Sequence, residues 1–390
     1  MSAVIRTISS LNEISGDDWD RCANPASRAY NPFISYSFLH ALEVSGSATA
    51  ETGWHGCHVI LEDTAGAVEG VLPCYLKPHS SGEYVFDYGW AEAYERAGGR
   101  YYPKLQASVP FSPVTGPRFL VPDCENPAHR KRLLAEGAKL ACEKLNASSV
   151  HITFLPEADW REIGDDGWLR RTDTQFHWHN AEYRTFDDFL ASLSSRKRKN
   201  IVRERRIAHG HGLTIERLTG ADITESHWDA FYRFYLETGS RKWGTPYLNR
   251  QFFSLIGQTI ANDIMLVMIA RDGRLIGGAL NMIGGDTLFG RNWGAVEHYD
   301  CLHFEACYYQ AIEFAIERGL ASVEAGAQGP HKLARGYLPK TTYSLHYLAD
   351  PRFARAVEDY LEHERSAVAQ DNKMLGAHSP FRKNDGDTGN

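Results

Sequence analysis

One short segment, Val323–Leu338, concentrates side chains that could do chemistry. It reads VEAGAQGPHKLARGYL and begins in an apolar stretch that predicts a strand ending near Ala325. Loops at strand ends are where a rigid scaffold presents binding and catalytic groups. A carboxylate, an imidazole, two cations and a phenol in one loop suit a site that holds an anion and moves a proton, although a solvated loop would also be polar. The candidates are Glu324, Gln328, His331, Lys332, Arg335 and Tyr337.

A basic stretch in the middle of the chain could bind anions. Phe186–Gly210 is predicted to be helical, and it contains the run RKRKNIVRERR. Basic residues that recur every three or four positions share one face of a helix. Such a face suits the phosphates of a cofactor or of RNA, or it is a solvated charged face. The residues are Arg196, Lys199, Arg203 and Arg206.

Further cations follow a helix that is predicted to end at Gly239. Arg241 and Lys242 precede Trp243 there. A cation beside an aromatic ring can hold a planar or anionic ligand. Cations at the end of a helix also neutralise its dipole, so both interpretations stay open.

The composition is typical of a globular protein in a reducing compartment. The chain has 390 residues, of which 43% are hydrophobic and 23% charged, and a formal net charge of −7. It can therefore bury cores for two domains, and it does not coat nucleic acid or membrane with its whole surface. The N-terminus lacks a secretory signal, no stretch of about 18 apolar residues predicts a spanning helix, and none of the seven cysteines forms a C-x-x-C pair. We expect a cytoplasmic protein with reduced thiols and no transmembrane segment.

The order of predicted elements repeats, which indicates a duplicated α/β fold. In the second half, strands are predicted at Ile264–Ala270, Leu275–Ile283 and Thr287–Val296, and Arg271–Arg274 between the first two contains the Asp-Gly signal of a hairpin turn. A helix beginning near Phe304 and a strand at Ala321–Ala325 follow. The first half has a similar order of strands, helix and strand, in which Tyr84–Asp87 could extend the sheet and a loop rich in Tyr, Gly and Pro is expected from Tyr88 to Pro117. We predict a mixed twisted sheet flanked by helices in each half, with domains at residues 1–183 and 184–380 and a disordered tail at 381–390.

Several nucleotide-binding and nucleophile motifs are missing. The sequence has no G-x-x-x-x-G-K-[ST], no G-x-G-x-x-G after a strand and no G-x-S-x-G. P-loop, dinucleotide-binding and hydrolase-type sites are therefore not predicted. Two histidine pairs, His177 with His179 and His209 with His211, lack the neighbouring acidic or cysteine ligands that a metal site needs, so no metal site is predicted.

Three long segments resemble a bacterial family of predicted N-acyltransferases. They are SSRKRKNIVRERR, LHFEACYYQAIEFAIERGL and EAGAQGPHKLARGYLP, and FSPVTGPR at Phe111–Arg118 adds a fourth. On these motifs the chain resembles the FemAB-like group from about Asn31 to Lys383. The resemblance implies a duplicated GNAT (acyl-CoA N-acyltransferase) fold. It also implies transfer of an acyl or aminoacyl group to an amine, on a peptidoglycan precursor or a small molecule.

The donor that the resemblance implies is acyl-CoA or aminoacyl-tRNA, used as a co-substrate, with no tightly bound cofactor. In the usual GNAT pattern, a glycine-rich loop before the central helix holds the pyrophosphate of CoA on backbone N–H groups. Here Glu297–Glu305 reads EHYDCLHFE and contains no glycine. This departure weakens the case for CoA and leaves room for an RNA donor.

The implied reaction assigns roles to the candidate residues. Transfer to an amine needs a base, donors for the carbonyl oxyanion and a proton for the leaving group. We predict that Glu324 or His331 accepts the amine proton, and that Tyr337 or Tyr343 protonates the leaving group. The residues predicted to bind the donor or acceptor are Arg196, Lys199, Arg203, Arg241, Lys242, Trp243, Arg291, Asn292, Gln328, Lys332, Arg335 and Tyr343.

A function of a different class fits the same residues. A catalytically idle domain could recognise a cell-wall precursor or RNA on this fold. Such a module needs the basic face but not a buried acid–base pair.

Overall fold

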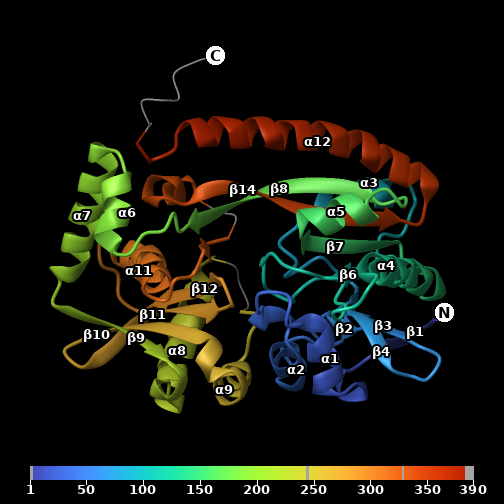
Figure 1. The fold of residues 1–390 in the computed structure, drawn as a ribbon, viewed down its shortest axis with the longest axis horizontal. Coiled ribbons are helices and arrows are strands. Elements are labelled where there is room, and N and C mark those ends of the chain that lie inside the picture. The colour runs from blue at the N-terminus through green and yellow to red at the C-terminus, as the bar shows by residue number, and fades with distance from the viewer. Residues whose placement is uncertain (1–2, 243–245, 327–328, 383–390) are drawn as a thin grey trace. The chain divides into compact units, whose positions relative to one another are not determined.

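The computed structural model describes residues 3–242, 246–326 and 329–382. The chain divides into two units, each built from strands and helices (Figure 1). The sequence suggests two consecutive domains with a boundary after residue 183. The two units are instead interleaved along the chain, because strands β8 (Leu169–His179) and β14 (Leu338–Leu348) each begin in one unit and end in the other. Unit 1 comprises Met1–Asp173, Tyr247–Thr259 and Thr341–Ala369, and unit 2 comprises Thr174–Pro246, Ile260–Lys340 and Gln370–Asn390.

Unit 1 contains a small antiparallel sheet of order β1-β3-β4 and a second set of paired strands, β2-β5-β6-β7-β14, in which only β6 and β7 are parallel. Its strands besides β8 and β14 are β1 (Val4–Ile8), β2 (His55–Gly56), β3 (His58–Glu62), β4 (Val68–Leu72), β5 (Tyr75–Lys77), β6 (Lys104–Ala107) and β7 (Ser149–Leu155). Its helices are α1 (Gly16–Ala23), α2 (Tyr36–Val44), α3 (Tyr88–Arg96), α4 (Pro127–Lys144), α5 (Glu157–Ile163), α9 (Arg250–Thr259) and most of α12 (Pro351–Ala377).

Helix α4 and strand β7 lie at the centre of unit 1. Asn126 caps α4 by accepting a hydrogen bond from a backbone N–H of the first turn. Val150 and Ile152 of β7 pack with this helix in the apolar core. The alternate side chains of the strand are polar and equally buried, so each needs a hydrogen-bond partner. They are Ser149, His151 and Thr153.

Unit 2 is built on strands in the order β8-β13-β12-β11-β10-β9, antiparallel except for β12 and β13. Its remaining strands are β9 (Leu213–Thr219), β10 (Ile264–Arg271), β11 (Arg274–Ile283), β12 (Thr287–Ala295) and β13 (Ser322–Glu324). Its helices are α6 (Phe186–Ser192), α7 (Ser195–His209), α8 (Glu225–Lys242), α10 (Leu302–Phe304), a π-helical turn η5 (Glu305–Tyr309), α11 (Gln310–Glu317) and a 3-10 helix η6 (Pro330–Arg335).

Strands β10, β11, β12 and β13 of unit 2 lie where the alternation and turn signals predict them, whereas β9 is not among the predicted strands. The turn between β10 and β11 has positive φ at both Asp272 (50°) and Gly273 (75°), as a two-residue hairpin turn of type I′ requires. The central helix begins two residues before the expected Phe304 and is interrupted by η5. Its apolar face packs in the core of this unit, as its period predicts. The predicted α/β class, with mixed sheets flanked by helices, is confirmed.

Some predicted elements differ from the observed ones for local reasons. The single helix expected at Phe186–Gly210 is two helices, because Leu193 is extended and the N–H of Ser194 bonds to the carbonyl of Pro380 instead of continuing α6. Helix α8 does not stop at Gly239 but continues to Lys242. At the C-terminus, Phe381 forms a bridge with Leu193, so the disordered tail predicted from residue 381 is wrong at its first residue. Residues 383–390 of that predicted tail lie outside the described residues.

In the first half, the segment Tyr84–Asp87 does not extend the sheet as a strand, although its aromatic residues favour one. The Tyr-, Gly- and Pro-rich segment after it, which suggests a loop, contains α3 and β6. Among the helices that the structure describes, none combines the length and apolar composition needed to cross a bilayer.

Candidate active site

Glu324 lies where two strands of unit 2 part. The parallel pairing of β12 with β13 covers Thr287–Phe289 and ends at the pair Phe289–Glu324. Strand β12 continues to Ala295 while pairing with β11, but β13 ends at Glu324. A side chain on the next residue of β12, Gly290, would come within 3.2 Å of the Glu324 carbonyl oxygen, so glycine permits the close approach. Glu324 is therefore fixed at the point of separation and is only 6% exposed.

His177 faces Glu324 across the sheet. The antiparallel register of β8 and β13 pairs the two residues directly, and His177 Nδ1 lies 3.9 Å from Glu324 Oε1. His177 Nε2 lies 3.2 Å from Oε1 of Gln175, which only accepts, so we assign the ring proton to Nε2. Burial, and then the charges of His179, Lys340 and Lys332, lower the pKa of His177 to about 3. The imidazole is therefore neutral near pH 7, with the lone pair of Nδ1 toward the carboxylate.

Lys332 orders the chain that follows Glu324. Its ammonium donates to the carbonyls of Ala325 and Gly326, and the side chain is buried. Burial lowers the pKa of Lys332 to about 8. Because two of its three N–H donors are engaged, Lys332 holds Ala325 and Gly326 in place, and its expected role in binding phosphate stays a prediction.

His331 belongs to an aromatic cluster around the π-helical turn. Its Nε2 lies 3.0 Å from the Tyr308 hydroxyl, and its ring is 5.7 Å from that of Phe304. Burial, together with the charges of Arg335 and Lys332, lowers the pKa of His331. The structure thus gives His331 a phenol as its partner and places Glu324 beside a different histidine.

Arg335 and Tyr337 are committed to internal contacts. The Arg335 guanidinium lies 3.4 Å from the centre of the Phe304 ring, pairs with Glu204 at 2.9 Å and donates to the His331 carbonyl. Tyr337 is fully buried and donates to the Tyr308 carbonyl at 3.3 Å. The expected roles of Arg335 in donor binding and of Tyr337 as a proton donor stay predictions.

Helix α7 is basic on its exposed side and ion-paired on the other. Arg205 reaches the fully buried Glu305 of the π-helical turn at 2.9 Å, and Gln310 and His209 contact the same carboxylate. The outward basic residues share a face, as their spacing predicts, and they are Arg196, Lys199, Arg203 and Arg206. Whether they bind phosphate stays a prediction.

The other predicted ligand-binding residues are dispersed. Arg291 and Asn292 lie half-buried on β12, just past the point where β13 parts from it. Tyr343 belongs to unit 1, where its ring lies 5.1 Å from Trp160. Gln328 and Trp243 lie outside the described residues, as do the side chains of Arg241 and Lys242 at the end of α8.

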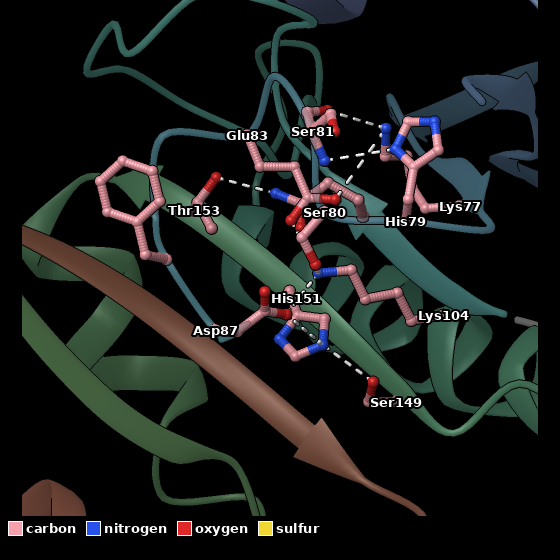
Figure 2. A network of polar contacts seen from close by, with 12 residues as sticks. Lys77, His79, Ser80, Ser81, Glu83, Asp87, Lys104, Ser149, His151 and Thr153 are labelled. Carbon is pink, nitrogen blue, oxygen red and sulfur yellow. Dashed lines mark hydrogen bonds and ion pairs between the residues drawn. The ribbon is translucent and has the colours of Figure 1, made fainter. Parts of the chain in front are cut away.

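Unit 1 contains a buried ionic network that the sequence did not reveal (Figure 2). The Lys104 ammonium lies 2.7 Å from Glu83 Oε2, bonds to Asp87, and donates to Ser80 at 2.8 Å. Lys77 lies 3.6 Å above the Trp54 ring and 4.0 Å from Glu83. Burial raises the pKa of Glu83 to about 7 and lowers that of Lys77 to about 7. Strongly shifted groups of this kind mark candidate functional sites as well as structural networks.

Two histidines extend this network across β7 and β14. His151 Nδ1 lies 2.7 Å from His346 Nδ1, so one ring donates to the other. His151 Nε2 lies 2.8 Å from the Ser149 hydroxyl. Burial, with the charge of Lys104, lowers the pKa of His151 to about 3, so it is neutral near pH 7. The alternation of polar residues in β7 was the available sequence signal, but it does not disclose the partners. In the described part of both units, no three His, Cys, Asp or Glu side chains are grouped as metal ligands.

This fold is found among solved structures, including the following three. FemX matches with a TM-score of 0.55 at 13% identity, covering 92% of this chain and all of that one. The C-terminal domain of a putative lysylphosphatidylglycerol synthetase from Agrobacterium fabrum matches with a TM-score of 0.53 at 10% identity. The match covers 88% of this chain and 96% of that domain. L-PGS from Bacillus licheniformis matches with a TM-score of 0.51 at 8% identity, and the match covers 90% of this chain and 98% of that chain. At these identities the similarity establishes the class of fold, and function must come from the site.

The family follows from the sequence itself. The profile of the FemAB-like family, described as peptidoglycan biosynthesis/recognition, matches residues 10–383. The chain therefore belongs to the FemAB-like family. No curated protein sequence matches it significantly.

The ionic network predicts a strong dependence of stability on Lys104. Lys104→Ala should lower the free energy of unfolding by about 3–5 kcal/mol, because it leaves Glu83 and Asp87 buried without their cation. Urea denaturation measures this loss. Arg96→Ala is the control, because it breaks a surface ion pair in which the Arg96 side chain is 71% exposed and that of Glu92 is 69% exposed. This substitution should change the free energy of unfolding little. Equal effects of the two substitutions would contradict this account.

Lys332 predicts a pH dependence of stability. Its folded pKa of about 8 lies below the ordinary lysine value, so above pH 8 the unfolded chain binds a proton that the folded chain does not. Wild-type protein should therefore gain stability relative to Lys332→Met as pH rises above 8, by about 1 kcal/mol per pH unit at most. Denaturation at several pH values measures the difference. Lys340→Met, which removes an exposed lysine, should not show this gain.

Proposed function

We propose that this protein transfers an acyl or aminoacyl group to an amine, with Glu324 accepting the amine proton. The observation that carries this proposal is a buried carboxylate fixed where β12 and β13 part, with the lone pair of a neutral histidine beside it. Membership of the FemAB-like family supports an acceptor related to peptidoglycan precursors. The fold similarity to a putative lysylphosphatidylglycerol synthetase is compatible with aminoacyl transfer.

The spacing of the two acceptors suits one amine. Glu324 Oε1 and His177 Nδ1 are 3.9 Å apart, so a nitrogen placed between them could donate a hydrogen to each at ordinary hydrogen-bond length. This arrangement would orient the nitrogen lone pair away from both groups and toward the donor carbonyl. Because both side chains are at least nine-tenths buried, water competes weakly for these contacts.

The transfer step balances with these groups. The amine nitrogen attacks the carbonyl carbon, a C–N bond forms, and the Glu324 carboxylate takes the proton that the nitrogen loses. The C–O bond of an ester donor, or the C–S bond of a thioester, then breaks. The proton on Glu324 returns to the departing oxygen or sulfur, so the step needs no additional acid.

For the donor, we favour aminoacyl-tRNA over acyl-CoA. Helix α7 presents a row of outward cations, which suits a phosphate backbone. The segment before the central helix lacks glycine, and α10 spans only Leu302–Phe304 before the π-helical turn, so it offers no long helix N-terminus to a pyrophosphate. Titration calorimetry with acetyl-CoA and with charged tRNA tests this choice. Binding of acetyl-CoA alone would reverse it, and binding of neither would favour a recognition function that uses other ligands.

The proton-transfer role predicts the effect of Glu324→Gln. The amide keeps the shape of the side chain but cannot accept the proton, so turnover should fall by about 100-fold or more while donor binding is retained. Single-turnover transfer to a soluble peptidoglycan-precursor amine, with the donor that binds, measures it. Glu317→Gln, the same change at a side chain that is 51% exposed, is the control. Unaltered turnover in folded Glu324→Gln protein would remove Glu324 from this role.

The basic face predicts the salt dependence of tRNA binding. In Arg196→Ala/Lys199→Ala/Arg203→Ala, the slope of log affinity against log salt should become shallower by about 0.7–0.9 for each phosphate that the variant no longer neutralises. Filter binding at several salt concentrations measures the slope. Arg96→Ala/Arg161→Ala/Arg352→Ala removes as many exposed cations from unit 1 and should leave the slope unaltered. If both variants lower the slope equally, α7 is not the platform.

A further inference from the structure

The segment before α3 in unit 1 has an inverted pattern of burial. Glu83 and Asp87 are each 3% exposed, whereas the rings between and after them face solvent. Tyr84 is 38% exposed, Phe86 56% and Tyr88 52%. Acids are therefore inside and aromatic rings outside, which is the reverse of what the hydrophobic effect favours. Local violations of this kind concentrate at functional sites.

Buried ion pairs fix this inversion. Lys104 holds both carboxylates (Figure 2), and the Arg171 guanidinium donates to the Phe86 carbonyl at 2.9 Å. Tyr84 has φ +63°, a left-handed conformation that side chains other than glycine adopt at a cost. The ionic network requires the acids to point inward, but it does not require large rings at the outward positions. The rings therefore need an explanation of their own.

A fourth exposed ring is linked to the start of this segment. Tyr247 is 38% exposed and stacks on the buried Phe111, with ring centres 4.8 Å apart and planes 14° apart. The N–H of Phe111 donates to the carbonyl of Gly82 at 3.2 Å, two residues before Tyr84. Phe86 and Tyr88 have ring centres 6.1 Å apart and planes 23° apart. The group offers flat apolar faces edged with phenol hydroxyls.

The segment that carries Tyr84, Phe86 and Tyr88 is not basic. Residues 82–95, GEYVFDYGWAEAYE, contain no lysine or arginine. Two cations that reach the segment from elsewhere in unit 1 are engaged, since Lys104 is buried between carboxylates and Arg171 pairs with Glu364 at 2.8 Å. Single-stranded RNA and anionic lipid surfaces are held by aromatic groups together with exposed cations. An uncharged ligand fits this surface better.

We infer that Tyr84, Phe86, Tyr88 and Tyr247 form a platform that binds the sugar rings of an uncharged glycan. The apolar C–H face of a sugar packs on an aromatic face, and phenol hydroxyls bond to sugar hydroxyls. An exposed patch of large apolar side chains is otherwise a liability in a soluble protein. The inference concerns unit 1 alone. It goes beyond the proposed transfer reaction and does not depend on that reaction.

Titration of the full-length protein with the tetramer of N-acetylglucosamine, followed by tyrosine and tryptophan fluorescence and by calorimetry, tests the platform. Phe86→Ala/Tyr88→Ala should weaken binding by about tenfold or more, because stacked aromatic contacts each contribute on that scale. Tyr360→Ala on α12, which removes a ring that is 52% exposed in the same unit, should leave the affinity unaltered. Glu324→Gln should also bind as wild type does, which separates this result from the proposed reaction.

The inference would be overturned if binding of the tetramer were undetectable. It would also be overturned if Phe86→Ala/Tyr88→Ala did not weaken that binding. A soluble glycan strand from peptidoglycan, titrated in parallel, distinguishes the source of the sugar, since tighter binding of that strand assigns the platform to cell-wall glycan. RNA and phosphatidylglycerol vesicles serve as competing ligands. Binding of either one that the double variant abolishes, without binding of the tetramer, would also overturn the inference.

Discussion

A charge removed from water needs a partner, and this constraint organises both units. In unit 1, Lys104 is held between Glu83 and Asp87. In unit 2, Glu305 at the π-helical turn is held by Arg205, and Glu204 is held by Arg335. Removing one member of such a group leaves the other charge buried in a low-dielectric interior without a partner. The buried pairs therefore fix where the surrounding segments lie, and the candidate sites are built on those segments.

The same constraint separates residues that hold the structure from residues that could act on a substrate. Lys332 and Arg335 have the residue types of phosphate ligands, but backbone carbonyls and a carboxylate take up their hydrogen bonds. Tyr337, whose phenol suits an acid, is a buried core residue. Glu324 faces a neutral imidazole across the sheet, and that histidine places a second hydrogen-bond acceptor beside the carboxylate.

The fold was largely predictable, and the site was predictable only in part. Hydrophobic periodicity and the Asp272–Gly273 turn signal located strands β10, β11 and β12, because local pattern and local geometry agree there. The interleaving of the units was not predictable, since it depends on which strands pair at long range. Glu324 could be proposed from its place at a strand end, but its partner His177 lies on another strand, and only the register of β8 with β13 brings the two together. For the network around Lys104, the polar alternation in β7 was the available signal, but its acids were not predictable because they lie in a segment without regular structure.

The two ends of the proposed chemistry rest on different physical features. Acceptor activation depends on buried geometry: two acceptors 3.9 Å apart at a strand separation, where a shift of one residue in register would turn Glu324 to the opposite face of the sheet. Donor recruitment depends on exposed charge along α7, which tolerates changes in sequence as long as the cations stay on one face. Strand register therefore constrains the first feature strictly, whereas the second depends only on where cations fall along a helix.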